Sequence, residues 1–175
     1  MLTLSTHVDL QAPVHRVWSV LLDFPNYPKW HPFVELAGTA VEGGTLAFTF
    51  RRWANATRRA SATATIVRLE EEAVFAFRYG HRAFLLAEDR FALSEVNGKT
   101  RVTRVTEYRG FVPLVSGWAA KKRMKSLLDL PVLSLARYLE SVNKPAAPAK
   151  TAPAKAAPIR SGFRQAPARR KRRTR

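Results

Sequence analysis

The 175-residue chain contains no cysteine, which excludes disulfide bonds, a thiolate nucleophile and thiolate metal ligands. Histidine is scarce, and the spacing of His7, His15, His31 and His81 is not that of a metal-binding helix. We therefore expect no metal and no cofactor. Because a cysteine-free chain is typical of a reducing compartment, we also expect a cytoplasmic location.

Long apolar runs are missing as well. A transmembrane helix needs about 18 or more consecutive apolar residues, and the longest apolar stretch here, residues 127–136, is interrupted by Asp129 and Pro131. The first ten residues have neither the basic segment nor the apolar core of a signal peptide, so we expect Met1 to begin the mature chain. The sequence therefore predicts no membrane span.

The C-terminal segment lacks acidic residues. Residues 144–175 contain eleven Lys or Arg and no Asp or Glu, so most of the net charge of +17 lies there. Alanine, proline and lysine dominate, with few apolar side chains to bury, which predicts a disordered basic tail after one domain of residues 1–143. Such a tail is suited to non-specific nucleic-acid binding, to an anionic membrane surface, or to solubility alone.

The remaining sequence shows clear periodicities. Alternating apolar residues predict strands, and apolar residues three and four apart predict helices. The predicted strands cover residues 2–10, 33–40, 45–53, 58–69, 75–79, 83–95 and 100–109, and the predicted helices cover residues 13–23 and 116–141. Hairpin-length connections between most strands favour an α+β fold with an antiparallel sheet.

Two features leave a choice between a packed core and a cavity. The segment FPNYPKWHPF at residues 24–33 is too apolar for a surface loop and too rich in proline for a helix or a central strand. It either fills a core or lines the mouth of a cavity. Ala60, Ala62 and Ala64 share one strand face. They either leave space for a ligand or allow a helix to approach closely.

Several motifs together resemble the SRPBCC or START-like superfamily, in its polyketide cyclase/dehydrase-like branch. They are APVHRVWSVLLDF at residues 12–24, YPKWHPF at 27–33, GGTL at 43–46 and YRGFVPL at 108–114. The resemblance spans roughly residues 3 to 142. It implies a helix-grip fold, in which a curved antiparallel sheet of about seven strands surrounds a long C-terminal helix and encloses a hydrophobic cavity. It also implies a small apolar ligand, such as a lipid or polyketide, with YPKWHPF near the entrance.

On this basis we expect the ligand to contact mainly aromatic side chains from the strands and from the 24–33 segment. The expected ligand-binding residues are Trp30, Phe33, Phe48, Phe50, Phe75, Phe77, Phe91, Arg104 and Tyr108. If there is no cavity, the same phenylalanines form an ordinary core.

The catalytic residues that the resemblance implies are absent. In this branch a histidine in an H-x-F pattern and a glutamate on the last strand are expected, but here Asp89 and Thr106 occupy these positions. Glu107 lies one residue further, so its side chain should point to the outer face. The turn Asn97-Gly98 predicts that Asp89 lies opposite Thr106 and is a diagonal neighbour of Arg104.

Three roles stay open for this pair: a structural ion pair, an anchor in which Arg104 binds a ligand carboxylate or carbonyl, and acid-base catalysis. The weak catalytic candidates are Asp89, Arg104 and His31. The main hypothesis is accordingly a carrier or sequestering module for a small hydrophobic ligand. A cyclase or dehydratase on a polyketide-like substrate is the alternative.

The third hypothesis is association with nucleic acid or an anionic surface through the basic tail, and two basic clusters inside the domain are further candidates for such contacts. Residues 51–59 contain four arginines around Trp53, and residues 121–125 contain four Lys or Arg. Arginine next to an aromatic ring is able to contact phosphate or a base. A solvated surface is the alternative explanation for both clusters.

Overall fold

A computed structural model describes residues 1–51 and 59–143, with the backbone alone for residues 112–124, 126, 127 and 143. Its seven-stranded sheet has the order β1-β7-β6-β5-β4-β3-β2, with every neighbouring pair antiparallel. The strands are β1 (Leu2–Leu10), β2 (Val34–Gly38), β3 (Thr45–Arg51), β4 (Arg59–Glu70), β5 (Val74–His81), β6 (Leu85–Val96) and β7 (Lys99–Arg109). All seven predicted strands are confirmed.

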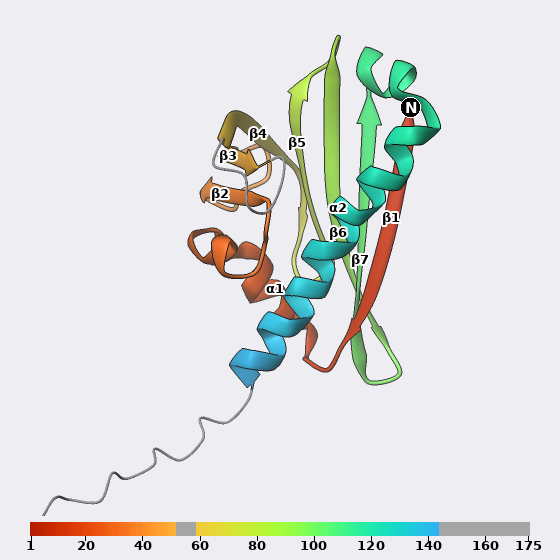
Figure 1. Ribbon diagram of the computed structural model, residues 1–175. Helices are drawn as coiled ribbons and strands as arrows, with labels where there is room; N and C mark the ends of the chain where they lie inside the picture. The colour runs from red at the N-terminus through yellow and green to blue at the C-terminus, as the bar shows by residue number, and fades with distance from the viewer. Residues whose placement is uncertain (52–58, 144–175) are drawn as a thin grey trace, which may run out of the picture. The chain divides into compact units, whose positions relative to one another are not determined.

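Three helices complete the described part of the chain: α1 (Val14–Leu22), the short 3-10 helix η1 (Phe24–Lys29) and α2 (Phe111–Asn143). In Figure 1, α2 crosses the sheet in front of β6, β7 and β1. Its apolar residues Leu128, Val132, Leu135 and Leu139 are buried, as their helical spacing predicts. A curved antiparallel sheet with a long C-terminal helix is the predicted helix-grip fold, although α2 begins five residues earlier than predicted.

The 24–33 segment does form helix, which corrects the expectation that its prolines exclude one. The 3-10 helix η1 accommodates Pro25 in its first turn, where the missing N–H is not needed, and contains Pro28. The Tyr27 hydroxyl donates to the carbonyl of Leu21, at the end of α1, at 2.9 Å. Because Phe24, Tyr27 and Trp30 are buried in the main core, the segment is fixed against the domain by its own aromatic rings.

The space above the alanines of β4 is filled by two rings from the neighbouring strands. Phe48 on β3 pairs with Ala62, and Tyr79 on β5 pairs with Ala64. The Phe48 and Tyr79 rings stack with centroids 4.1 Å apart. The small residues therefore allow two large side chains to meet across β4, an arrangement different from both alternatives, the open space and the close approach of a helix.

Close backbone contact at the turn between β5 and β6 requires glycine at position 80. Gly80 has a φ of +96°, and a Cβ atom there would lie 2.1 Å from the carbonyl oxygen of Leu85. Gly98 has a φ of +72° but no atom near its missing Cβ. Alanine at position 80 therefore has both the strain of a positive φ and a steric clash, whereas alanine at position 98 has the strain alone.

We predict that Gly80→Ala lowers the free energy of unfolding by more than about 3 kcal/mol, because β5 and β6 must move apart. Gly98→Ala should cost only about 1–2 kcal/mol, the strain of a left-handed alanine. Urea denaturation of both variants measures the difference. Equal losses would show that the close approach at Gly80 does not constrain the sheet.

Candidate ligand site

A buried charged pair joins β6 to β7 inside the sheet. Asp89 and Arg104 are 2% and 5% exposed. Arg104 Nε donates to Asp89 Oδ1 at 2.9 Å, and Nη2 donates to Oδ2. The Thr106 hydroxyl donates to Oδ1 at 2.9 Å. The carboxylate thus accepts hydrogen bonds at both oxygens, as a buried charge requires.

The turn at Asn97-Gly98 sets the register that creates this pair. Both residues have positive φ, as a two-residue hairpin turn needs. Asp89 consequently lies opposite Thr106, and Phe91 lies opposite Arg104, as predicted. The Glu107 side chain pairs with the exposed side chain of Arg109 at 2.8 Å. This pairing agrees with the outward orientation expected for Glu107.

Arg104 stays charged at this position. Burial alone would lower its pKa, but the charge and hydrogen bonds of Asp89 raise the pKa above its ordinary value. The guanidinium also lies over the Phe91 ring, 5.3 Å from its centroid. One of its nitrogens, Nη1, is buried and has no hydrogen-bond partner among the described residues.

A cavity of about 240 Å³ opens beside Arg104. Its walls come from the 31–34 segment, from β3, β5, β6 and β7, and from α2. The described residues that line it are His31, Phe33, Val34, Phe48, Phe50, Arg51, Tyr79, Leu85, Arg104, Tyr108 and Leu128. Most of these side chains are apolar, with Arg104 as a buried charge among them.

His31 faces this cavity in a defined protonation state. Its Nδ1 accepts from the backbone N–H of Val34 at 3.0 Å and lies 3.3 Å from that of Phe33, so the proton of the neutral ring is on Nε2. Burial, together with the charge of Arg104, holds the pKa of His31 well below 6.5. The imidazole is therefore a neutral hydrogen-bond donor.

The two tyrosines of the cavity are neutral too. Burial, with a contribution from Asp89, raises the pKa of Tyr108 to about 12. Burial, with smaller contributions from Tyr108 and Asp89, raises the pKa of Tyr79 well above 10. Both hydroxyl groups therefore keep their protons at neutral pH.

The predicted ligand-binding residues divide into two groups. Five of them line the cavity: Phe33, Phe48, Phe50, Arg104 and Tyr108. The other four, Trp30, Phe75, Phe77 and Phe91, are buried in the main core, and Trp30 also borders a groove against α2. Alternation identified the correct strand face, but it did not identify the position of the hollow along each strand.

Residues that were not predicted as ligand contacts also line the cavity. They are Val34, Arg51, Tyr79, Leu85 and Leu128, together with His31, which was only a weak catalytic candidate. Tyr79 was detectable in the sequence because it shares a strand face with Phe75 and Phe77. Leu128 was not, because helical spacing does not show which buried residue faces an empty space.

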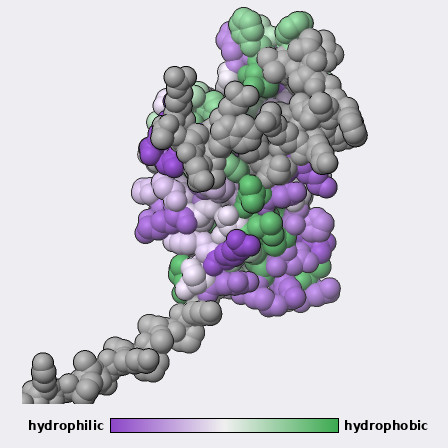
Figure 2. Space-filling model, viewed as in Figure 1, coloured by the Kyte–Doolittle hydropathy of each residue, from purple (hydrophilic) through white to green (hydrophobic). Residues whose placement is uncertain are grey.

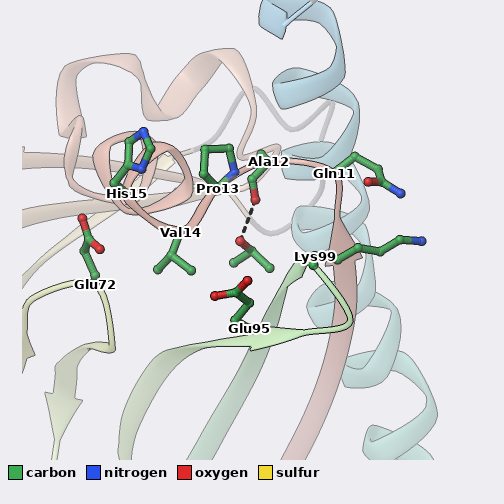
Figure 3. Close-up of a pocket in the computed structure, with 10 residues that line it drawn as sticks. Gln11, Ala12, Pro13, Val14, His15, Glu72, Glu95 and Lys99 are labelled. Carbon is green, nitrogen blue, oxygen red and sulfur yellow. Dashed lines mark hydrogen bonds between the residues drawn. The ribbon is translucent and has the colours of Figure 1, made fainter.

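A larger hollow of about 570 Å³ lies at the other end of β6 and β7, between α1 and the 97–98 turn. Figure 3 shows Glu72, Glu95 and Lys99 at its edge, with Lys99 pointing away. The dashed line there is the bond from the Thr100 hydroxyl to the carbonyl of Ala12, 2.6 Å long. This hollow is open and of mixed charge, and none of the predicted site residues lines it.

The described part of the first basic cluster is partly neutralised within the sheet. Arg51 and Arg59 both pair with Glu35, at 2.6 Å and 3.0 Å. Arg52, Trp53, Arg58 and the basic tail of residues 144–175 lie outside the described residues. No helix among the described residues is long and apolar enough to span a membrane.

Solved structures of other proteins share this helix-grip architecture, and three of them are as follows. A START superfamily protein from Mycobacterium smegmatis is 18% identical, with a TM-score of 0.67, over 80% of this chain and 98% of that one. Protein NE0264 from Nitrosomonas europaea is 15% identical, with a TM-score of 0.63, over 81% and 96%. The di-domain ARO/CYC protein BexL from the BE-7585A biosynthetic pathway is 14% identical, with a TM-score of 0.67, over 83% and 48%.

Sequence identities this low show that the fold is similar and nothing more. This chain spans about half the length of BexL. The family profile described as polyketide cyclase / dehydrase and lipid transport matches residues 1–140. The chain belongs to this family, which confirms the resemblance seen in its motifs. A search of curated proteins gave no match.

Removing one member of the buried pair should be far more costly than removing both. Asp89→Leu or Arg104→Met leaves an uncompensated buried charge, and each should lower the free energy of unfolding by about 3–5 kcal/mol. The double variant should lose much less than the sum of the two, because neither charge remains. A urea denaturation cycle measures this coupling. Additive losses would contradict a directly coupled pair.

His31 should make stability depend on pH. The unfolded chain protonates this residue near pH 6.5, whereas the folded protein keeps it neutral to a lower pH. The unfolded state therefore binds more protons between these two values, and stability should fall below about pH 6.5 by up to about 1.4 kcal/mol per pH unit.

His31→Asn retains an acceptor for the backbone N–H groups and should remove this part of the slope. The matched control is His81→Asn, because the exposed His81 also accepts from a backbone N–H, that of Ala83. Denaturation midpoints between about pH 7 and pH 5 provide the comparison. An unchanged slope in His31→Asn would contradict a neutral buried imidazole.

Proposed function

We propose that the protein binds a small apolar molecule that carries one carbonyl or carboxylate group, with the apolar part in the 240 Å³ cavity and the polar group on Arg104. The unpartnered Nη1 of Arg104 is the single observation that carries this proposal. A buried donor without a partner costs about 1–3 kcal/mol, and more if it is charged. A ligand oxygen at this nitrogen removes that cost.

The walls of the cavity support an apolar guest. Phe33, Val34, Phe48, Leu85 and Leu128 supply hydrocarbon surface from four different segments. Burial of apolar ligand surface against such walls contributes about 25 cal/mol per Å² before the costs of association. Few precisely placed polar groups in a mostly apolar pocket are typical of small-molecule sites.

The volume limits the size of the guest. A cavity of about 150 Å³ is enough for benzene, and drug-sized ligands occupy about 300–1,000 Å³. The cavity described here, at about 240 Å³, lies between these values. It therefore suits a molecule with one or two rings better than a lipid with two acyl chains.

The charge of Asp89 gives Arg104 its orientation. Because Nε and Nη2 are held by the carboxylate, the remaining nitrogen keeps a fixed direction without a ligand. Preorganised donors lose little side-chain entropy on binding. His31 Nε2–H and the hydroxyl groups of Tyr79 and Tyr108 are further neutral donors for the same ligand.

A cyclase or dehydratase activity is the second candidate, and the same donors favour it. An enolate oxygen formed during cyclisation of a polyketide-like substrate would be stabilised by Arg104 and by neutral donors around it. Asp89 is unsuited to act as the base, because both of its oxygens already accept hydrogen bonds. Binding with an oriented polar group is therefore the better supported function.

Binding of 2-naphthoate tests the proposal, with naphthalene as the probe without a carboxylate. We expect 2-naphthoate to bind at least about tenfold more tightly, because only the carboxylate reaches Arg104 Nη1. Arg104→Lys keeps a cation beside Asp89 but removes the guanidinium nitrogen proposed to contact the carboxylate. The two probes should then bind this variant with similar affinity. Titration followed by naphthoate fluorescence gives the affinities.

A substitution that fills the cavity provides a second, independent test of the proposal. Leu85→Trp should abolish uptake of both probes, whereas Leu133→Trp, at a half-exposed position on α2 outside the cavity, should leave it unchanged. Equal affinity of the wild type for both probes would overturn the role of Arg104. Uptake that survives Leu85→Trp, or no uptake at all by the wild type, would overturn the cavity as the binding site.

A further inference from the structure

Two phenylalanine rings project into solvent at the end of the sheet where β5 turns into β6 and β7 leads into α2. Phe84 and Phe111 are 66% and 61% exposed. Apolar side chains of this size are usually buried, and an exposed pair at one end of a domain requires an explanation. Figure 2 shows hydrophobic side chains at the upper end, where Figure 1 places this turn.

The backbone beneath these two rings is tightly joined. The Phe111 N–H donates to the carbonyl of Ala83 at 3.3 Å, and the Phe84 N–H donates to that of His81 at 3.1 Å. Gly110 has a φ of +111°, and a Cβ there would lie 2.6 Å from the carbonyl oxygen of Phe84. Glycine thus permits a close approach of the two backbone segments that carry Phe84 and Phe111.

The surroundings of the two rings are cationic. Arg82 and Arg109 flank them and are exposed, and Arg109 pairs with Glu107 at 2.8 Å. The sequence contains no acidic residue from 73 to 87 or from 108 to 128. After Phe111 it continues with the uncharged stretch VPLVSGWAA and then with KKRMK, whose Lys125 is exposed. Lys and Arg near an anionic lipid surface are attracted to it.

We propose that this end of the domain, which we call the aromatic tip (Phe84 and Phe111 with Arg82 and Arg109), docks on an anionic lipid bilayer. The rings insert at the level of the headgroups, and Arg82 contacts lipid phosphates, whereas Arg109 is already paired with Glu107. Two exposed rings are too few for a stable protein interface, which buries about 1,200–2,000 Å². Shallow insertion into a membrane needs no matching partner surface.

Docking at the aromatic tip would bring the cavity close to the bilayer. Leu85, which lines the cavity, directly follows Phe84, and Tyr108, which also lines it, lies three residues before Phe111. An apolar guest would then exchange with the membrane over a short path. The docking proposal does not rest on the proposed function, because the rings and charges at the tip are independent of cavity occupancy.

Vesicle co-sedimentation of the full chain tests the aromatic tip. The vesicles contain phosphatidylcholine with or without phosphatidylglycerol, at about 0.15 M salt. Phe84→Ser/Phe111→Ser should weaken binding to anionic vesicles by at least about tenfold, because two inserted rings are lost. Every charge is retained, so the contribution of the basic tail is the same in both proteins.

The matched control is Val41→Ser/Leu133→Ser, which removes two other exposed apolar side chains, 54% and 49% exposed, outside the tip. It should bind vesicles as the wild type does. Urea midpoints and 2-naphthoate titrations without vesicles check that the fold and the cavity are unchanged, which separates a failure of this proposal from a failure of the proposed function.

Three results would overturn docking at the tip. One is equal vesicle binding by the wild type and the double phenylalanine variant, which would assign the binding to the basic tail. Another is the absence of binding to any vesicle. The third is a phenylalanine-dependent affinity for a single-stranded oligonucleotide without such an effect on vesicles, which would identify base stacking as the role of the rings.

Discussion

The ion pair between Asp89 and Arg104 is the constraint on which the account of this domain depends. A charge buried to this extent is tolerated only when its partner is held in place. The pair therefore requires one register of β6 against β7, and that register also places Thr106 beside Asp89 and Phe91 beside Arg104. Burial, with the charge of Arg104 as the smaller cause, lowers the pKa of His31, and one guanidinium nitrogen of Arg104 has no partner among the described residues.

The interior of the curved sheet is divided into a packed part and a hollow part. Phe24, Phe75, Phe77 and Phe91 pack against one another in the first, with ring centroids about 5.4 to 6.3 Å apart. The hollow part lies toward the β5–β6 turn, next to Arg104. The 24–33 segment contributes to both, because Phe24 and Tyr27 fill the core whereas His31 and Phe33 line the cavity. The two alternatives for this segment are therefore both correct, for different residues.

The strands, the register of β6 against β7 and the charged pair were predictable from the sequence, because alternation and the Asn97-Gly98 turn are local signals that fix long-range geometry. The cavity lining was only partly predictable. Phe48 and Phe75 lie on the same face of the sheet and are both buried in the core, but only Phe48 also lines the cavity. The role of the β4 alanines also depends on curvature, because it decides whether Phe48 and Tyr79 meet above them. The 3-10 helix was missed because its hydrogen bonds tolerate prolines that an α-helix does not.

Native mass spectrometry of the full chain, purified from its own cells, tests the central claim most directly. If the cavity holds an oriented guest, a fraction of the protein should carry one additional small molecule, with a carbonyl or carboxylate group, that is released on denaturation. Repeated preparations that show only the mass of the chain, before and after incubation with one- and two-ring carboxylates, would contradict the account.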